Sequence, residues 1–145
     1  MNIKELEDRV ALKELIDRFS ILGDQKDFKN QVQLFTENAV SETLAAGTVI
    51  LKLEGRKVMA KAFSKFLEGF ETVYHFNGQH VVSINGDDAT GICYCKITLI
   101  GSEEGKKVKT TIGARYADEY VKLENVWRIA RRVGTFDWQE KLELR

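Results

Sequence analysis

The sequence predicts one α+β domain in which three helices, all from the first half of the chain, cover one face of a curved, cone-shaped antiparallel sheet. Apart from residues 39–53, apolar residues recur at helical spacing up to Phe70, and from His75 onward they alternate as in strands. The 145 residues, 43% of them hydrophobic, have the size of a single domain, 1–145. The chain has no proline, and we find no linker that would divide it. Helices over a curved sheet can enclose a pocket suited to a small molecule.

Helical spacing predicts three helices. The first runs from Ile3 to Leu22, and Gly23 is expected to end it. A second, from Phe28 to Phe35, follows a short loop that carries Asp24, so the two helices should pack as a hairpin. The third opens at Gly55 and continues to Phe70. The stripe on the first helix comprises Ile3, Leu6, Val10, Leu15, Ile16, Phe19 and Leu22.

Alternating apolar residues predict six strands. Two short strands flank the Ala46-Gly47 turn, and four longer ones follow with glycine-, asparagine- or aspartate-rich turns between most of them. Strands joined by such short turns pair antiparallel, so the second half predicts an antiparallel meander. The predicted strands are 39–44, 48–53, 75–84, 89–100, 108–123 and 126–136.

The composition limits the partners of the chain. Lys and Arg total 22, as do Asp and Glu, so there is no net charge to attract nucleic acid or an anionic membrane. The charged N-terminus lacks the apolar stretch of a secretory signal, and no segment is long enough to span a membrane, so we expect a cytoplasmic protein. Cys93 and Cys95 share one face of a predicted strand and are expected to be buried reduced thiols rather than metal ligands.

The chain has two histidines, His75 and His80. His75 lies where the helical pattern gives way to a strand, and histidine is the side chain whose ordinary pKa lies near neutrality, so His75 is a candidate for proton transfer. On a regular strand His80 faces the other way, toward solvent or an interface. Structural alternatives remain open: His75 as a half-buried histidine bonded to backbone, and Asp24 as a turn or helix-entry residue.

Several motifs run along the chain: Asp24-Gln25-Lys26-Asp27-Phe28, His75 with Gln79 four residues on, Asn85-Gly86-Asp87-Asp88-Ala89, Gly113-Ala114-Arg115-Tyr116-Ala117-Asp118, Trp127-Arg128-Ile129-Ala130-Arg131-Arg132-Val133 and Asp137-Trp138. Together they resemble the SnoaL-like family of the nuclear-transport-factor-2-like superfamily over nearly the whole chain. The resemblance implies a cystatin-like fold. Most of these motifs are structural, so they identify a fold better than a reaction.

Within that superfamily, scytalone dehydratase and a dehydrochlorinase are similar to this chain at Asp24 and His75. The resemblance implies that His75 removes a proton from a substrate carbon, while Asp24 orients the imidazole and stabilises its charged form. Such chemistry needs no metal or organic cofactor. Gly23 stands where scytalone dehydratase is expected to have a tyrosine, and an apolar residue near Leu99 stands in place of a further histidine. The expectation is therefore a reaction type, a dehydratase- or cyclase-like lyase or isomerase.

Gln79, Tyr116 and Arg131 are candidate substrate-binding residues. Gln79 stands where many SnoaL-like sequences have asparagine. On a regular last strand Arg131 shares a face with Ile129, where it would pair with a substrate anion or, as a structural ion pair, with Asp118. Tyr116 either lines the cavity or packs in the sheet.

Three functions remain open from the sequence. The first is a cofactor-free lyase or isomerase that uses Asp24 and His75 on a small apolar molecule, aromatic or polycyclic. The second is a non-catalytic ligand-binding or assembly module of the same fold, which the missing tyrosine and histidine favour. The third is a structural role like that of the small subunit of ring-hydroxylating dioxygenases. Apolar residues left on the outer face of the sheet predict a homodimer.

Overall fold

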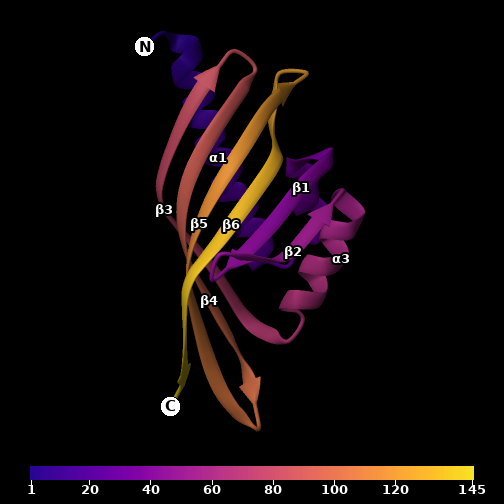
Figure 1. Ribbon diagram of the computed structural model, residues 1–145, viewed down its shortest axis with the longest axis vertical. Coiled ribbons are helices and arrows are strands. Elements are labelled where there is room, and N and C mark those ends of the chain that lie inside the picture. The colour runs from indigo at the N-terminus through magenta and orange to yellow at the C-terminus, as the bar shows by residue number, and fades with distance from the viewer.

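A computed structural model describes all 145 residues and has the predicted α+β architecture. The elements in chain order are α1 (Ile3–Asp24), α2 (Phe28–Gln31), the single turn η1 (Val32–Leu34), β1 (Phe35–Ala45), β2 (Thr48–Glu54), α3 (Arg56–Leu67), β3 (Phe70–Asn85), β4 (Asp88–Glu103), β5 (Lys106–Leu123) and β6 (Val126–Glu143). The four long strands, β3 to β6, run along the longest axis of the molecule, with α1 behind them and β1, β2 and α3 to one side (Figure 1).

The six strands form one sheet in the order β2-β1-β6-β5-β4-β3. The predicted antiparallel meander from β3 to β6 is confirmed, and β1 and β2 also pair antiparallel. The exception is the pair between β1 and β6, which is parallel, so the sheet is mixed. The β1–β2 hairpin pairs with the free edge of β6 through β1. No local sequence pattern indicates whether that pairing is parallel or antiparallel.

The second predicted helix is shorter than expected, because β1 begins at Phe35 and not at residue 39. The i, i+4, i+7 spacing of Phe28, Val32 and Phe35 predicted one helix. Phe28 and Val32 do lie in helical turns, but Phe35 lies in the strand that follows them. Phe35 is fully buried and packs edge-to-face on Phe19, with the ring centroids 5.3 Å apart. This contact places the start of β1 against α1.

The buried face of α1 differs from the predicted apolar stripe. Asn2 begins the helix by accepting a hydrogen bond from the Glu5 backbone N–H at 2.8 Å. In the first turns Ile3 and Val10 are 76% and 61% exposed, whereas Asp8 is buried. Asp8 faces the sheet because polar side chains of the sheet pair with its carboxylate there. The buried residues of α1 are Asp8, Leu12, Leu15, Ile16, Ser20 and Gly23.

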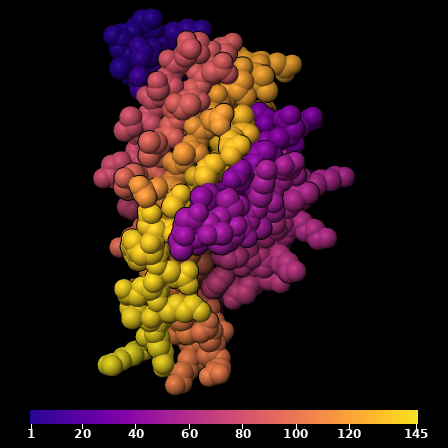
Figure 2. Space-filling model, viewed as in Figure 1, coloured from indigo at the N-terminus to yellow at the C-terminus, as the bar shows by residue number.

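Helices and strands enclose the core on the inner face of the sheet, the face that α1 and α3 cover. Inward side chains of β4 such as Cys93 and Leu99 are buried, while alternate residues such as Tyr94 are exposed on the outer face. The β4–β5 hairpin and the end of β6 extend beyond the helices at one end of the molecule (Figures 1 and 2). No helix is both long enough and apolar enough to cross a membrane.

Candidate active site

The structure brings Asp24 and His75 into direct contact. Asp24 is the last residue of α1, and His75 lies on the inner face of β3. Asp24 Oδ1 lies 2.7 Å from His75 Nδ1, and Asp24 Oδ2 accepts the backbone N–H of His75 at 3.2 Å. Both side chains are about four-fifths buried, at 23% and 21% exposed. The carboxylate thus fixes both the ring and the strand that carries it.

The Asp24 contact sets the hydrogen-bonding roles of the imidazole. A carboxylate only accepts, so in the neutral ring Nδ1 carries the proton and donates it to Asp24. Nε2 is then the free acceptor, available to take a proton from a bound molecule. A carboxylate on Nδ1 also stabilises the imidazolium that forms after such a transfer.

Gly23 does not end α1 as predicted, because the helix continues through Asp24 and the chain turns at Lys26, which has a left-handed φ of 57°. Gly23 instead permits a close approach by Gln31. A Cβ at position 23 would lie 2.7 Å from Gln31 Nε2. That amide donates to the Phe19 carbonyl at 3.0 Å.

A cavity of about 180 Å³ lies between the sheet, the end of α1 and α3, and His75 forms part of its wall. Most of its lining is apolar, and Ile50 and Phe66 are more than half exposed, so they lie at its open side. Its polar side chains come from Gln31, Ser41, Thr43, His75, Tyr116 and Arg132; the other lining residues are Phe19, Gly23, Phe28, Leu51, Ala62, Phe63, Leu67, Ile97, Leu99, Ile112 and Phe136.

Arg132, not Arg131, is the arginine in this wall. The pairing of β5 with β6 shifts by one residue where Tyr120 opposes Ile129 and Glu119 opposes Arg131, so Ala130 is an extra residue in β6. Such a bulge reverses the facing of every residue beyond it. Arg131 therefore lies outside the cavity, 43% exposed and paired with Glu42 at 2.7 Å.

Gln79 also lies outside the cavity. It borders a depression with Phe76, Tyr94, Arg115 and Trp138 on the outer face of the sheet, opposite the helices. The pairing of β3 with β4 shifts between residues 77 and 80, and this bulge is what turns His80 inward. The prediction that His80 faces solvent or an interface is therefore wrong.

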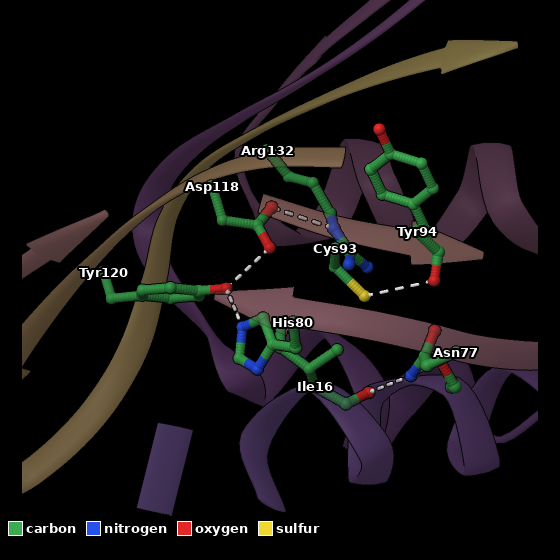
Figure 3. A network of polar contacts seen from close by, with 9 residues as sticks. Ile16, Asn77, His80, Cys93, Tyr94, Asp118, Tyr120 and Arg132 are labelled. Atoms are coloured by element: carbon green, nitrogen blue, oxygen red, sulfur yellow. Dashed lines mark hydrogen bonds and ion pairs between the residues drawn. The ribbon is translucent and has the colours of Figure 1, made fainter. Parts of the chain in front are cut away.

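A buried network holds Arg132 in place, and Figure 3 shows it running from Arg132 through Asp118 and Tyr120 to His80. Arg132 Nε donates to Asp118 Oδ1 at 2.9 Å, and the Tyr120 hydroxyl donates to Asp118 Oδ2 at 2.7 Å. His80 Nε2 lies 3.1 Å from the same hydroxyl. Burial lowers the pKa of His80, against the opposing charge of Asp118. His80 is accordingly neutral near pH 7.

The guanidinium of Arg132 is also stacked between aromatic rings. Its Cζ lies 3.8 Å from the ring centroid of Tyr116 and 5.0 Å from that of Phe19. Burial acts to lower the pKa of Arg132, but the negative charge of Asp118, together with smaller contributions from Tyr116 and Tyr120, raises it. Burial raises the pKa of Tyr116. The cavity wall therefore carries a permanent, immobilised positive charge beside a neutral phenol.

Sequence reasoning missed Gln31 and Arg132 as cavity residues. The sequence did place the adjacent pair Arg131-Arg132 on the last strand. Which of the two arginines faces the cavity depends on a bulge at Ala130, and no local sequence pattern indicates that bulge. Gln31 sits in a stretch that reads as an ordinary helix, and only the approach to Gly23 brings it to the cavity. No three His, Cys, Asp or Glu side chains are grouped as metal ligands.

Comparisons with known proteins agree with this architecture. An uncharacterized protein of Mycobacterium tuberculosis (strain H37Rv) is 27% identical over 143 residues, covering 98% of this chain and 94% of that protein. A structure provisionally named scytalone dehydratase, from Novosphingobium aromaticivorans, superposes with a TM-score of 0.85 at 17% identity over 100% of this chain and 94% of its own.

Two further structures are similar in fold. An NTF2-like protein with a cystatin-like fold, also from Novosphingobium aromaticivorans, has a TM-score of 0.71 at 24% identity, covering 92% of this chain and 84% of that one. Hexachlorocyclohexane dehydrochlorinase LinA-type3 from Novosphingobium barchaimii has a TM-score of 0.81 at 17% identity, covering 98% and 94%. The model of the SnoaL-like domain matches residues 4–133, which is most of the chain. This chain therefore belongs to the SnoaL-like domain family.

Proposed function

We propose that this protein is a cofactor-independent lyase or isomerase in which His75 is the general base and Asp24 orients it. The observation that carries the proposal is the 2.7 Å contact between Asp24 Oδ1 and His75 Nδ1 at the wall of a largely apolar cavity. An oriented imidazole whose second nitrogen is free is the arrangement that proton abstraction requires.

In the proposed reaction His75 Nε2 takes a proton from a substrate carbon, and the C–H electron pair stays with the substrate. In a lyase a leaving group then departs from the neighbouring carbon with the electron pair of the bond that breaks, the C–H pair forms a carbon–carbon double bond, and the imidazolium gives its proton to the leaving group or to water. In an isomerase the imidazolium returns the proton to a different carbon. Asp24 stabilises the imidazolium between these steps.

Arg132 supports this proposal through its fixed guanidinium group. Negative charge develops on the substrate as the proton leaves, and the preorganised Arg132–Asp118 pair, whose positive end lies in the cavity wall, stabilises that charge. The ion pair with Asp118 and the stacking on Tyr116 fix the guanidinium before substrate arrives. The guanidinium therefore need not reorganise during the reaction.

A non-catalytic binding module of the same fold is the second candidate. It is favoured by Gly23 and Leu99, which line the cavity at or near positions where a scytalone dehydratase is expected to have catalytic side chains. In this case the cavity would bind small molecules, and substitution of His75 would change no turnover because there would be none.

The test is a screen of dehydration, dehydrohalogenation and isomerisation substrates on the wild type, His75→Gln and Asp24→Asn. We expect each substitution to lower kcat by between about 10² and 10⁴, the usual contribution of a positioned base. Asp87→Asn, in the exposed β3–β4 turn, is the matched control for the lost charge and should keep full activity. Turnover that survives His75→Gln would exclude this mechanism.

A further inference from the structure

The open side of the cavity is bordered by exposed apolar side chains. β2 and α3 lie next to each other at one side of the sheet, and both contribute to the cavity wall (Figure 1). Four apolar side chains of these two elements are between 43% and 59% exposed. Apolar residues scattered singly over a surface are ordinary, but a group of them at one place marks a site of interaction. We call this group the apolar rim: Ile50 and Leu51 of β2, and Val58 and Phe66 of α3.

A bulge in β2 places two consecutive residues on the apolar rim. Thr43 of β1 opposes Leu51 and Leu44 opposes Val49, so Ile50 is an extra residue in β2. On a regular strand Ile50 and Leu51 would point to opposite faces, whereas both of them line the cavity. β2 is an edge strand of the sheet, so no further strand lies beyond these side chains. This part of the apolar rim therefore belongs to the surface of the protein.

α3 adds a row of lysines beside the apolar rim. Residues four apart on a helix lie on one face, so Val58, Ala62 and Phe66 form an apolar stripe, and Ala62 and Phe66 line the cavity. A lysine directly precedes each of these three residues in the chain. The lysines therefore form a second stripe, about 100° further around the helix, and all three are exposed. We call Lys57, Lys61 and Lys65 the basic stripe.

The charge around the cavity mouth is positive, although the chain as a whole is neutral. Residues 51–67 contain five Lys or Arg residues and one acidic residue, whereas the whole chain has 22 of each kind. The ion pairs that lysines form in this protein involve none of the basic stripe. Charges more than about 10 Å away are largely screened by salt, so a local cluster attracts a negative surface whatever the net charge.

We propose that the mouth of the cavity docks on the surface of an anionic lipid bilayer, with the basic stripe at the headgroups and the apolar rim inserted toward the acyl chains. A bilayer presents negative charge next to an apolar layer, which matches a basic stripe next to an apolar one. A second copy of this chain fits less well, because a two-fold contact through the apolar rim would bring the lysines of both copies together. The inference is independent of the proposed chemistry, since it uses only the apolar rim and the basic stripe.

The test is co-sedimentation of the wild-type protein with vesicles of phosphatidylcholine, with and without about one-third phosphatidylglycerol. We expect the anionic vesicles to bind the protein at least about tenfold more strongly than the neutral ones at low salt. The difference should fade as the salt concentration approaches about 1 M, because the headgroup charge is then screened. Equal binding to both vesicles, or binding to neither, would overturn the proposal.

Two triple variants separate the local charge from the net charge. Each lysine near an anionic surface contributes roughly fivefold in affinity, so the combined substitutions Lys57→Gln, Lys61→Gln and Lys65→Gln should lower binding about a hundredfold. The matched control removes the same charge from exposed positions on α1 and at the start of β5, and it should keep nearly full binding. It combines Lys4→Gln, Lys13→Gln and Lys106→Gln. An equal loss in the two variants would show that the basic stripe has no special part, and would overturn the proposal.

A matched pair of isoleucine substitutions tests the apolar rim. Ile50→Ser should lower binding to the anionic vesicles roughly fivefold, because about half of an apolar side chain would no longer leave water. Ile21→Ser is the control, since Ile21 is 54% exposed on α1 and Ile50 is 59% exposed. Light scattering without lipid tests the competing occupant. If the wild type ignores the vesicles and Ile50→Ser lowers its mass in solution, the apolar rim is an interface between copies and the lipid assignment is wrong.

Discussion

Asp8 is a buried carboxylate that ties α1 to the sheet, and we expect Asp8→Ala to be strongly destabilising. Its Oδ1 accepts the indole N–H of Trp127 at 2.9 Å and pairs with Lys122 Nζ at 2.8 Å. The side chains of Asp8 and Lys122 are only 10% and 8% exposed. The substitution would leave a buried ammonium group and an indole N–H without partners.

The magnitude follows from this geometry. Breaking a buried ion pair by removing one partner costs about 3–5 kcal/mol. The low end applies here, about 3 kcal/mol, because the flexible Lys122 stem lets its amine move toward water. For a chain of this length that loss lowers Tm by roughly 6–12 °C. The measurement is urea unfolding followed by circular dichroism, with thermal melts alongside.

Glu14→Ala is the matched control on the same helix. Glu14 pairs with Arg18 at 3.1 Å, but both side chains are about 60% exposed, so its removal should cost no more than about 0.5 kcal/mol. If Asp8→Ala costs no more than Glu14→Ala, the view that Asp8 anchors α1 is refuted.

The pH dependence of Asp8 gives a second readout. The hydrogen bond from Lys122, against the effect of burial and with help from Trp127, holds the pKa of Asp8 below its ordinary value. Its contribution to stability is therefore full above the unfolded pKa of about 3.9 and is lost as pH falls through the lowered folded pKa. The stability difference between wild type and Asp8→Asn should be constant from pH 7 to about 5 and shrink below pH 4. A difference that grows in acid would contradict this assignment.

Three further results are expected. Gly91→Ala should destabilise the protein by about 1–3 kcal/mol in urea unfolding, because a Cβ there would lie 2.8 Å from the buried Tyr120 ring. Cys93 and Cys95 should resist a thiol reagent at pH 8 until the chain unfolds, because both are buried and burial raises their pKa values to about 11 and 12. We also propose self-association through the outer face of the sheet, and Phe76→Glu, at a side chain 76% exposed there, should convert a dimer to a monomer in size-exclusion chromatography with light scattering.

Each of these has its own check. Gly69→Ala introduces a Cβ with no heavy atom within 4 Å, so its stability should not change as that of Gly91→Ala does. Val58→Glu places the same charge on an exposed residue of α3, away from the outer face, and should leave the oligomer intact. A monomeric wild type would rule out the dimer, and rapid labelling of the native thiols would show that the core around β4 opens readily.

The sequence by itself determined which kinds of element form and in what order. Helical spacing and strand alternation are local, because each depends on neighbours within one or two turns or along one strand. The long strands β3 to β6 and the approximate position of α3 were therefore predictable. Asp24 and His75 could be named as partners only through family resemblance, since 51 residues separate them and their contact is tertiary.

The tertiary structure decided which side chains face the cavity. A bulge at Ala130 exchanged Arg131 for Arg132, and a bulge before His80 turned that histidine inward. It also decided that β1 pairs parallel to β6, and that Asp8 rather than the apolar Ile3 and Val10 faces the sheet. The physical reason is common to all four: an added residue, an unpaired strand edge or a buried charge is stable only where a distant strand supplies the register or the partner, and the neighbouring sequence does not indicate which strand that is.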